Sequence, residues 1–210
     1  MGSRLTVGRQ PLELDILGPN PSSPAQYLKH MSWKTLNSKE VYKNKWMTVT
    51  EDEVETDSGK RLTYGIIHKK PFALIIPWDG KYFTLVGQYR HAIRKFSWEF
   101  PQGHFEHNSI EETAKSELKE ETGLSADSMK MIGHYYLGPG HHSQECKVFL
   151  AERLTKGKPN LEEGEVASGM KTMKVTTKKF DEMIKTKKME DGPSLAALAI
   201  LNNFWKRKAD

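Results

Sequence analysis

The sequence has almost no cysteine and no long apolar run. Cys146 is the only cysteine among 210 residues, so no disulfide can form within the chain and no zinc site built on several thiolates is available. The longest apolar runs, Phe72–Trp78 and Leu195–Leu201, have seven residues each, whereas a membrane-spanning helix needs about 18 or more. These absences exclude a disulfide scaffold and a helical membrane protein, and they favour a cytoplasmic location.

The composition also lacks the signs of disorder or of a fibrous protein. Apolar residues make up 37% of the chain, charged residues 28% and aromatic residues 10%, which is typical of a globular fold. The 32 basic and 27 acidic residues give a net charge of +5, which favours phosphorylated ligands only weakly. Lysines concentrate in residues 171–188 and 206–208, a pattern that is usually a solvated face.

The first 30 residues differ from the rest of the chain. Four prolines interrupt any periodicity there, and the segment lacks the basic start and continuous apolar stretch of a secretory signal. We expect residues 1–30 to be a flexible extension, a remnant of an over-long gene start or a cloning remnant. We expect residues 31–208 to form one domain, with N-terminal strands over residues 31–70 and a core over residues 71–208.

Strand patterns dominate from Trp33 onward. Residues 46–54 alternate with a period of two, and after an Asp-Ser-Gly-Lys turn residues 61–68 return, which predicts a hairpin. Residues 72–77 are continuously apolar, and Asp79-Gly80 leads into residues 82–89, which predicts a second hairpin with one strand buried on both faces. Further elements are expected as strands at residues 129–136 and 146–153 and as helices at residues 180–187 and 193–208.

A helix is predicted from Ser109 to Gly123. Ser109 and Glu112 have the spacing of a capping box, and Gly123 stands where a left-handed residue ends a helix. The pattern of the whole chain therefore predicts an α+β or α/β/α domain in which strands precede and follow one central acidic helix.

Three glutamates near the end of this helix carry the chemical signal. Glu117, Glu120 and Glu121 lie three and four residues apart, so they share one side of a helix with about 3.6 residues per turn. They repel one another and oppose the helix dipole. A hard divalent cation with oxygen ligands, Mg²⁺ above all, would relieve that repulsion. The alternative is an exposed acidic flank.

The sequence around this helix resembles the Nudix box, G-x5-E-x7-R-E-U-x-E-E-x-G-U, where U is a bulky aliphatic residue. Two departures from the pattern stand in the first half. The spacing from Gly103 to Gly123 is one residue short, so Asn108 or Ser109 falls where the first glutamate belongs, and Ser116 replaces the arginine that orients the glutamates in the family. The second half matches at Glu117, Leu118, Glu120, Glu121, Gly123 and Leu124.

Beyond the box, most of residues 31–201 is similar to the ADP-ribose and nucleoside-diphosphate-sugar pyrophosphatase branch of the Nudix hydrolases. The segments that carry this similarity are Gln88-Tyr-Arg90, Glu99-Phe-Pro-Gln-Gly103, Leu137-Gly-Pro-Gly140 and Leu161–Glu165. The resemblance implies an α/β (α+β) Nudix fold, a mixed β-sheet sandwiched between helices. It also implies an extra N-terminal strand region over residues 31–70 that builds a homodimer, and a catalytic core over residues 71–208.

The resemblance further implies a Mg²⁺-dependent enzyme, with Mn²⁺ as another metal. The enzyme would cleave the pyrophosphate of a nucleoside diphosphate linked to another group, such as ADP-ribose or a nucleotide sugar, to give a nucleoside monophosphate and a sugar phosphate. Its partners would be this small-molecule substrate and a second copy of the chain, without a membrane or nucleic acid.

The resemblance assigns candidate roles to individual residues. Glu117 and Glu121 would ligate the metal, Glu120 would share or orient that ligation, and the backbone carbonyl of Gln102 would be a further ligand. A glutamate of the late loop, Glu162, Glu163 or Glu165, would be the general base, with Glu163 and Glu165 favoured.

Further residues are candidates for substrate binding. Arg90 would grip a phosphate or form a surface ion pair, and Glu99 and Gly103 would lie near the metal or substrate. Glu145 would bind a ribose hydroxyl beside the Gly138–Gly140 loop, or that loop would be a plain tight turn. Tyr64 or Trp46 would stack on a purine, whereas the adjacent His141 and His142 are interpreted as solvated loop residues.

Two other functions remain open from the sequence. An RNA 5′-pyrophosphohydrolase or dinucleoside-polyphosphate hydrolase shares the Trp98–Gly103 opening, and the basic C-terminal region would suit RNA. A non-catalytic nucleotide-binding module would explain Ser116 and the shortened box. Metal-dependent turnover and the choice of substrate distinguish these three functions.

Overall fold

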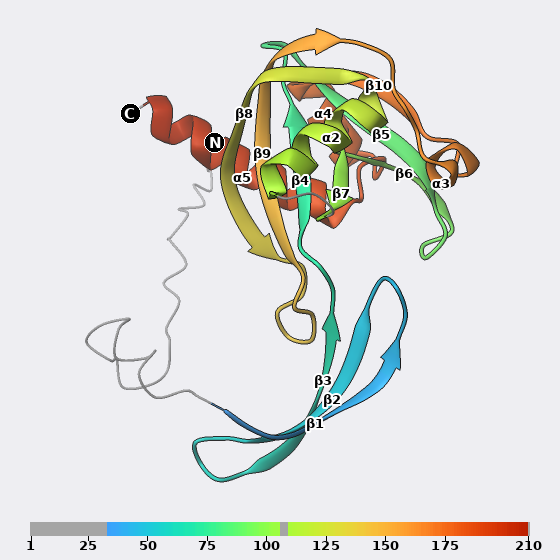
Figure 1. The fold of residues 1–210 in the computed structure, drawn as a ribbon. Helices are drawn as coiled ribbons and strands as arrows, with labels where there is room; N and C mark the ends of the chain where they lie inside the picture. The colour runs from blue at the N-terminus through green and yellow to red at the C-terminus, as the bar shows by residue number, and fades with distance from the viewer. Residues whose placement is uncertain (1–32, 106–108, 210) are drawn as a thin grey trace, which may run out of the picture.

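The computed structural model describes residues 33–105 and 109–209 (Figure 1). The predicted N-terminal extension, residues 1–30, and Asn108 lie outside the described residues. None of the helices in the described ranges is long and apolar enough to cross a membrane. In chain order the elements are β1 (Lys34–Lys43), β2 (Thr48–Glu55), β3 (Arg61–His68), β4 (Phe72–Pro77), β5 (Tyr82–Arg90), β6 (Lys95–Glu99), β7 (Gln102–His104), α2 (Ile110–Thr122), β8 (Leu124–Tyr136), β9 (Glu145–Lys156), α3 (Glu163–Ala167), β10 (Lys171–Thr176), α4 (Thr177–Lys185) and α5 (Gly192–Ala209).

The N-terminal strands form a sheet of their own. Its order is β1-β2-β3, and all its pairs are antiparallel. The β2–β3 hairpin is confirmed, with Thr48 opposite His68 and Glu55 opposite Arg61. This sheet extends away from the rest of the molecule (Figure 1), and every residue of β1 is exposed.

The core contains two sheets, β7-β4-β9-β8 and β10-β5-β6. β4 is one of the two inner strands of the first sheet and is buried along its whole length, as predicted. Because its side chains alternate between faces, they enter two apolar clusters. One face packs on α2, and the other meets β5, α4 and α5 (Figure 1). The first cluster includes Ala73, Ile75, Ala114 and Leu118, and the second includes Leu74, Ile76, Phe83, Phe180 and Leu201.

The predicted second hairpin is wrong. The Asp79-Gly80 turn forms, with the Asp79 carboxylate accepting from the Lys81 and Tyr82 amides. Beyond it, the backbone pairing between these two segments in the described residues is limited to the isolated Trp78–Phe83 bridge, although their side chains pack in one apolar cluster. β4 pairs instead with β7 and β9, and β5 with β6 and β10. The strands separate because each finds its partners later in the chain, which a local turn signal cannot show.

The acidic helix is built as predicted. The Ser109 side chain accepts from the Glu112 amide at the start of α2, and Gly123 ends the helix at φ 70°. Leu118 and Ala114 are fully buried against β4. This packing leaves the opposite side of α2, with its glutamates, turned toward β7 and the late part of the chain.

Candidate active site

An acidic cavity of about 690 Å³ lies where β6, β7, α2 and α3 meet the start of α5. Its described basic side chains are Lys69 and Arg90. Acidic side chains outnumber them, so the cavity favours a bound cation. The acidic lining residues are Glu99, Glu117, Glu121, Glu162, Glu165, Glu190 and Asp191.

Glu121 is the most deeply placed carboxylate of α2, with 4% of its surface exposed. Its Oε2 accepts a hydrogen bond from the Gln102 amide at 3.1 Å. Burial raises the pKa of Glu121 well above its ordinary value, and the charges of Glu117, Glu165 and Glu99 raise it further. The carboxylates therefore destabilise one another, which a cation between them would reverse.

Gly103 gives Glu117 its position. A Cβ at residue 103 would lie 1.7 Å from the Glu117 Oε1 atom, so only glycine lets this carboxylate rest on the β7 backbone. The carboxylates of Glu117 and Glu121 and the backbone of Gln102 and Gly103 thus meet at one wall of the cavity.

Glu99 lies at the centre of a second group of polar side chains. It is 1% exposed and bonds to Arg90 Nη2 at 2.8 Å, Gln88 Nε2 at 2.9 Å and Gln102 Nε2 at 2.9 Å. Burial raises the pKa of Glu99, and the Arg90 charge opposes that rise. Arg90 therefore forms an ion pair, but with a buried cavity carboxylate rather than a surface one.

Ser116 contacts the glutamate that the missing arginine would orient. Its Oγ donates to Glu120 Oε1 at 2.5 Å. Glu120 is half-buried and does not line the cavity, although its charge helps raise the pKa of Glu165. A serine at the arginine position thus holds Glu120 through one hydrogen bond from a neutral donor, without the positive charge of an arginine.

The late glutamate segment is a short helix, α3, and not the loop predicted from sequence. The Glu165 carboxylate accepts from the Glu162 amide at 2.7 Å and faces the cavity. Burial raises the pKa of Glu165, with added contributions from the charges of Glu162 and Glu120. Glu163 is exposed and does not line the cavity, so the structure brings Glu165, and not Glu163, to the other carboxylates.

Two residues predicted to bind the substrate, Glu145 and Tyr64, lie outside the cavity. Glu145 bonds to His134 Nδ1 and Lys147 Nζ and is not part of the cavity lining. The Tyr64 hydroxyl donates to the Gly140 carbonyl, outside the cavity. Trp46, the other candidate aromatic, does line the cavity, with its ring 6.4 Å from the ring of His104.

Sequence reasoning missed Gln88 and Ser168. Gln88 is buried and bonds to Glu99 through Nε2, while its Oε1 accepts from Ser168 Oγ at 3.3 Å. Ser168 also donates to the Glu165 carbonyl at 2.9 Å. These bonds join α3 to the Glu99 group across 80 residues of sequence, and only the position of Gln88 beside Arg90 could have suggested its role.

The donor set suits a divalent cation, because carboxylates and a backbone carbonyl are the oxygen ligands that Mg²⁺ and related ions take. The structural observation that fits such an ion is the meeting of the Glu117 and Glu121 carboxylates with the Gln102 and Gly103 backbone at one wall of an acidic cavity. Among the described residues, no three His, Cys, Asp or Glu side chains are already arranged to hold a metal, so binding would draw the carboxylates together.

Two family models match adjacent parts of the chain. The nucleoside diphosphate sugar hydrolase N-terminal domain matches residues 33–67, and the NUDIX domain matches residues 68–192. The boundary between them falls at the end of β3, where the N-terminal sheet meets the core.

The sequence similarity to several named proteins extends over most of this chain. An ADP-ribose pyrophosphatase of Bacillus subtilis is 28% identical over 178 residues, 83% of this chain and 95% of that protein. A methanol dehydrogenase activator of Bacillus methanolicus is 25% identical over 172 residues, 80% of this chain and 91% of that protein. The crystal structure of an ADP compounds hydrolase has the same fold, with a TM-score of 0.73 at 20% identity over 85% of this chain and 97% of that one.

The NUDIX match spans more than half of the chain, and it contains β4 to β10, the helix α2 and all the acidic residues of the cavity. Members of this family are hydrolases that generally use divalent metal ions. The sequence, the mixed α+β fold and the carboxylates around Glu121 agree that this chain belongs to the Nudix family of hydrolases.

Proposed function

We propose that the protein is a Mg²⁺-dependent hydrolase of nucleoside diphosphates linked to another group. ADP-ribose or a nucleotide sugar is the substrate, and the products are a nucleoside monophosphate and a sugar phosphate. The observation that carries this proposal is the convergence of Glu117, Glu121 and Glu165 on one cavity beside Arg90. The relative named ADP-ribose pyrophosphatase supports the substrate class.

Glu117, Glu121 and the Gln102 carbonyl would hold the ion, with Glu120 orienting this group from the same helix. A bound divalent ion would neutralise the charge of the diphosphate and acidify a water. Arg90 is fixed by Glu99 and still 41% exposed, so its free N–H groups orient the diphosphate in the cavity.

Glu165 is the proposed general base and accepts the proton of the attacking water on its carboxylate. Its pKa is raised by burial and by neighbouring acidic groups, which makes it a better base than an ordinary glutamate. Trp46 is the proposed stacking partner of the purine, because it lines the cavity.

The first experiment measures release of AMP and ribose 5-phosphate from ADP-ribose, with and without Mg²⁺. We expect turnover that EDTA abolishes, and Glu121→Gln lowers kcat by at least about 10³-fold. Glu163→Gln is the matched control, because Glu163 is exposed and outside the cavity. Nucleotide sugars and a triphosphorylated RNA complete the panel. Full turnover by Glu121→Gln, or phosphate release from the RNA alone, would contradict the proposal.

We also propose that the protein is a homodimer formed through the N-terminal sheet. Apolar and aromatic side chains are exposed on β1 and beside it, namely Trp33, Leu36, Val41, Tyr42 and Trp46, and an exposed apolar patch of this kind suits a protein interface. Light scattering at several protein concentrations should give twice the monomer mass of 24.0 kDa. A mass of one chain at all concentrations would refute the dimer.

A further inference from the structure

A second cavity of about 460 Å³ adjoins the active-site cavity. Ile93, Ser97 and Glu190 line both cavities, so the two are direct neighbours. The second one carries the opposite charge: its lining includes Lys95, Lys187 and Lys188, with Glu190 as its acidic residue. We name it the lysine cavity.

The lysines of this cavity stand on a fixed segment. Lys187 and Lys188 follow α4, and both backbone amides are bonded, to the carbonyls of Ile184 and Met183. Met189, the next residue, is 2% exposed and belongs to the larger apolar cluster. The segment is therefore anchored by its backbone and by a core side chain, whereas the lysine side chains are exposed.

Lys187 occupies a position that normally favours glycine. Its φ is 55°, in the left-handed region where a side chain costs free energy and where helices commonly end on glycine. A lysine in this conformation is an outlier of the kind that is often found at functional sites.

Aromatic rings form the other wall. Phe96 and Trp98 pack edge to face, with centroids 5.4 Å apart. Both rings lie over Gly87 of β5, where a Cβ would come within 2.6 Å of each. The Lys171 ammonium lies 5.0 Å from the Phe96 ring centre, so it adds positive charge near this wall without lining the cavity itself. The lysine cavity thus combines two aromatic rings with the cationic groups of Lys95, Lys187 and Lys188.

We propose that the lysine cavity binds a further phosphoryl group on the sugar that the enzyme releases as its sugar phosphate. The inference rests on the proposed function and narrows its substrate class to nucleoside-diphosphate sugars whose distal sugar is itself phosphorylated. The acidic cavity suits the reacting diphosphate only with a metal ion, whereas the lysine cavity offers cations from the protein itself. A doubly charged phosphate there meets Lys187 and Lys188, while Lys95 is paired with Glu190 at 3.3 Å.

The test compares ADP-ribose with ADP-ribose 1″-phosphate, which carries one more phosphoryl group on the distal ribose. We expect the KM of the wild-type enzyme to be about five- to ten-fold lower for the phosphorylated substrate. The double variant Lys187→Gly/Lys188→Gln should bring the two KM values within about two-fold of each other and leave kcat and the KM of ADP-ribose unchanged. The preference should also shrink at 0.5 M salt, because exposed charges are screened.

The double variant Lys187→Gly/Lys188→Gln is chosen because it should not destabilise the fold, so a change in KM can be assigned to the lost lysines. Glycine suits the left-handed position better than lysine, so the melting temperature should hold or rise. Lys185→Gln is the matched control, because Lys185 is exposed at the end of α4 and lines neither cavity. ADP-ribose 2′-phosphate, with its extra phosphate on the adenosine side, tests the position and should not be preferred.

Calorimetric titration of the same ligands separates this inference from the proposed function. A preference for the 1″-phosphate that the double variant loses, in an enzyme without turnover, would support the cavity and refute the hydrolase. Turnover with equal KM values in the wild-type enzyme, or a preference that survives in the double variant, would overturn the cavity. Equal loss in Lys185→Gln would also overturn it, because the effect would then be one of general charge.

Discussion

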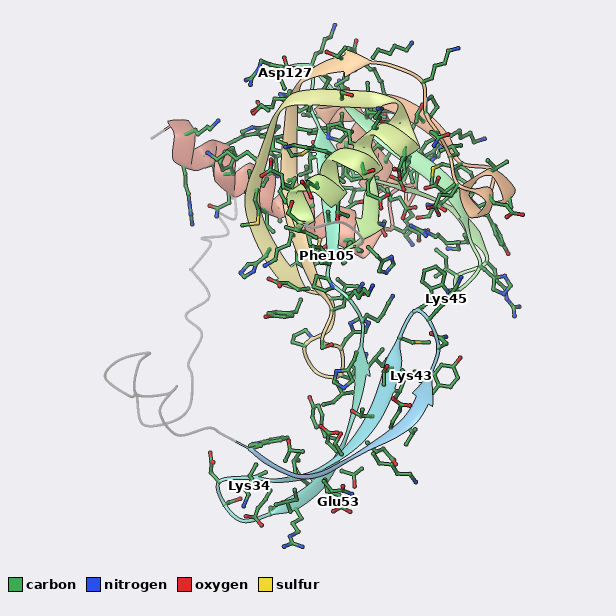
Figure 2. All side chains as sticks on the ribbon, viewed as in Figure 1. Lys34, Lys43, Lys45, Glu53, Phe105 and Asp127 are labelled. Carbon is green, nitrogen blue, oxygen red and sulfur yellow. The ribbon has the colours of Figure 1, made fainter. Side chains whose placement is uncertain are left out.

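The N-terminal sheet and the core are both built from β-strands but are held together by different interactions. Every residue of β1 is exposed, whereas every residue of β4 is buried. Among the apolar residues of the N-terminal sheet, Val54 is the buried one in the described structure. Side chains fill the core but stand apart on this sheet, where Lys34, Lys43 and Glu53 point into solvent (Figure 2). Backbone pairing therefore organises the sheet, and apolar burial organises the core.

The contacts between the two regions are few and specific. Ile67 of β3 exchanges backbone hydrogen bonds with His141 and Ser143, at 2.8 and 3.0 Å, and Tyr64 bonds to Gly140. The loop after β8 thus attaches the sheet to the core, while Trp46 reaches the active-site cavity from the β1–β2 turn. Among the described residues of the N-terminal sheet and its turns, Trp46 is the one that lines the cavity.

The largest loss of stability is expected when an aromatic side chain of the core is removed. Phe83 is fully buried and contacts Phe100, Phe180 and Trp205. Phe83→Ala should lower the free energy of unfolding by about 3–5 kcal/mol. Urea denaturation measures this, and the loss should not depend on protein concentration.

Tyr42→Ala is the counterpart in the N-terminal sheet, where the side chain is 52% exposed. If a second copy covers the sheet, its effect appears only as a shift that depends on protein concentration. A loss of several kcal/mol that does not vary with concentration would mean that this sheet has an apolar core of its own.

Two glycine substitutions compare the active site with the N-terminal sheet. Gly103→Ala places a Cβ on the Glu117 carboxylate, so this ligand must move, and kcat should fall about 10- to 100-fold. Gly65→Ala in β3 is the matched control, because nothing lies within 4 Å of its added Cβ. Equal kinetics for the two variants would show that Glu117 need not rest on β7.

Trp46→Ala measures how much the N-terminal sheet contributes to binding of the substrate. The ring lines the cavity, so its loss should raise the KM of a purine substrate about 5- to 20-fold with kcat little changed. Lys43→Ala serves as the control, since Lys43 is exposed, pairs with the exposed Glu40 and does not line the cavity. An unchanged KM in the Trp46 variant would place the purine elsewhere.

A small effect of pH is expected at the turn between β4 and β5. Burial acts to raise the pKa of Asp79, but hydrogen bonds from Lys174, Tyr82 and Lys81 outweigh it, and the pKa lies below its ordinary value of 3.8. Asp79 therefore stabilises the fold above that pH, and this contribution is lost as the pH falls through the lowered pKa. Asp79→Asn should cost at most about 1 kcal/mol at pH 7 and less near pH 2. Urea midpoints at the two pH values test it, and an equal cost at both would contradict the ionic origin.

Much of the local structure follows from short stretches of sequence. The cap at Ser109, the terminating Gly123 and the β2–β3 hairpin form as predicted, because each depends on groups within a few residues. The acidic side of α2 is likewise a matter of helical spacing. The family was predicted from the resemblance of Gly103–Leu124 to the Nudix box and not from these elements alone.

Tertiary structure decided which residues far apart in the sequence come into contact. β4 and β5 part into different sheets, the Gln102 amide meets Glu121 from 19 residues away, and Glu165 faces the cavity where Glu163 does not. The sequence by itself determined which residues share a helix side or a hairpin, since hydrogen bonds between near neighbours set these. Only the packed fold determined which side chains meet in the cavity, because burial selects partners over distances that no local pattern encodes.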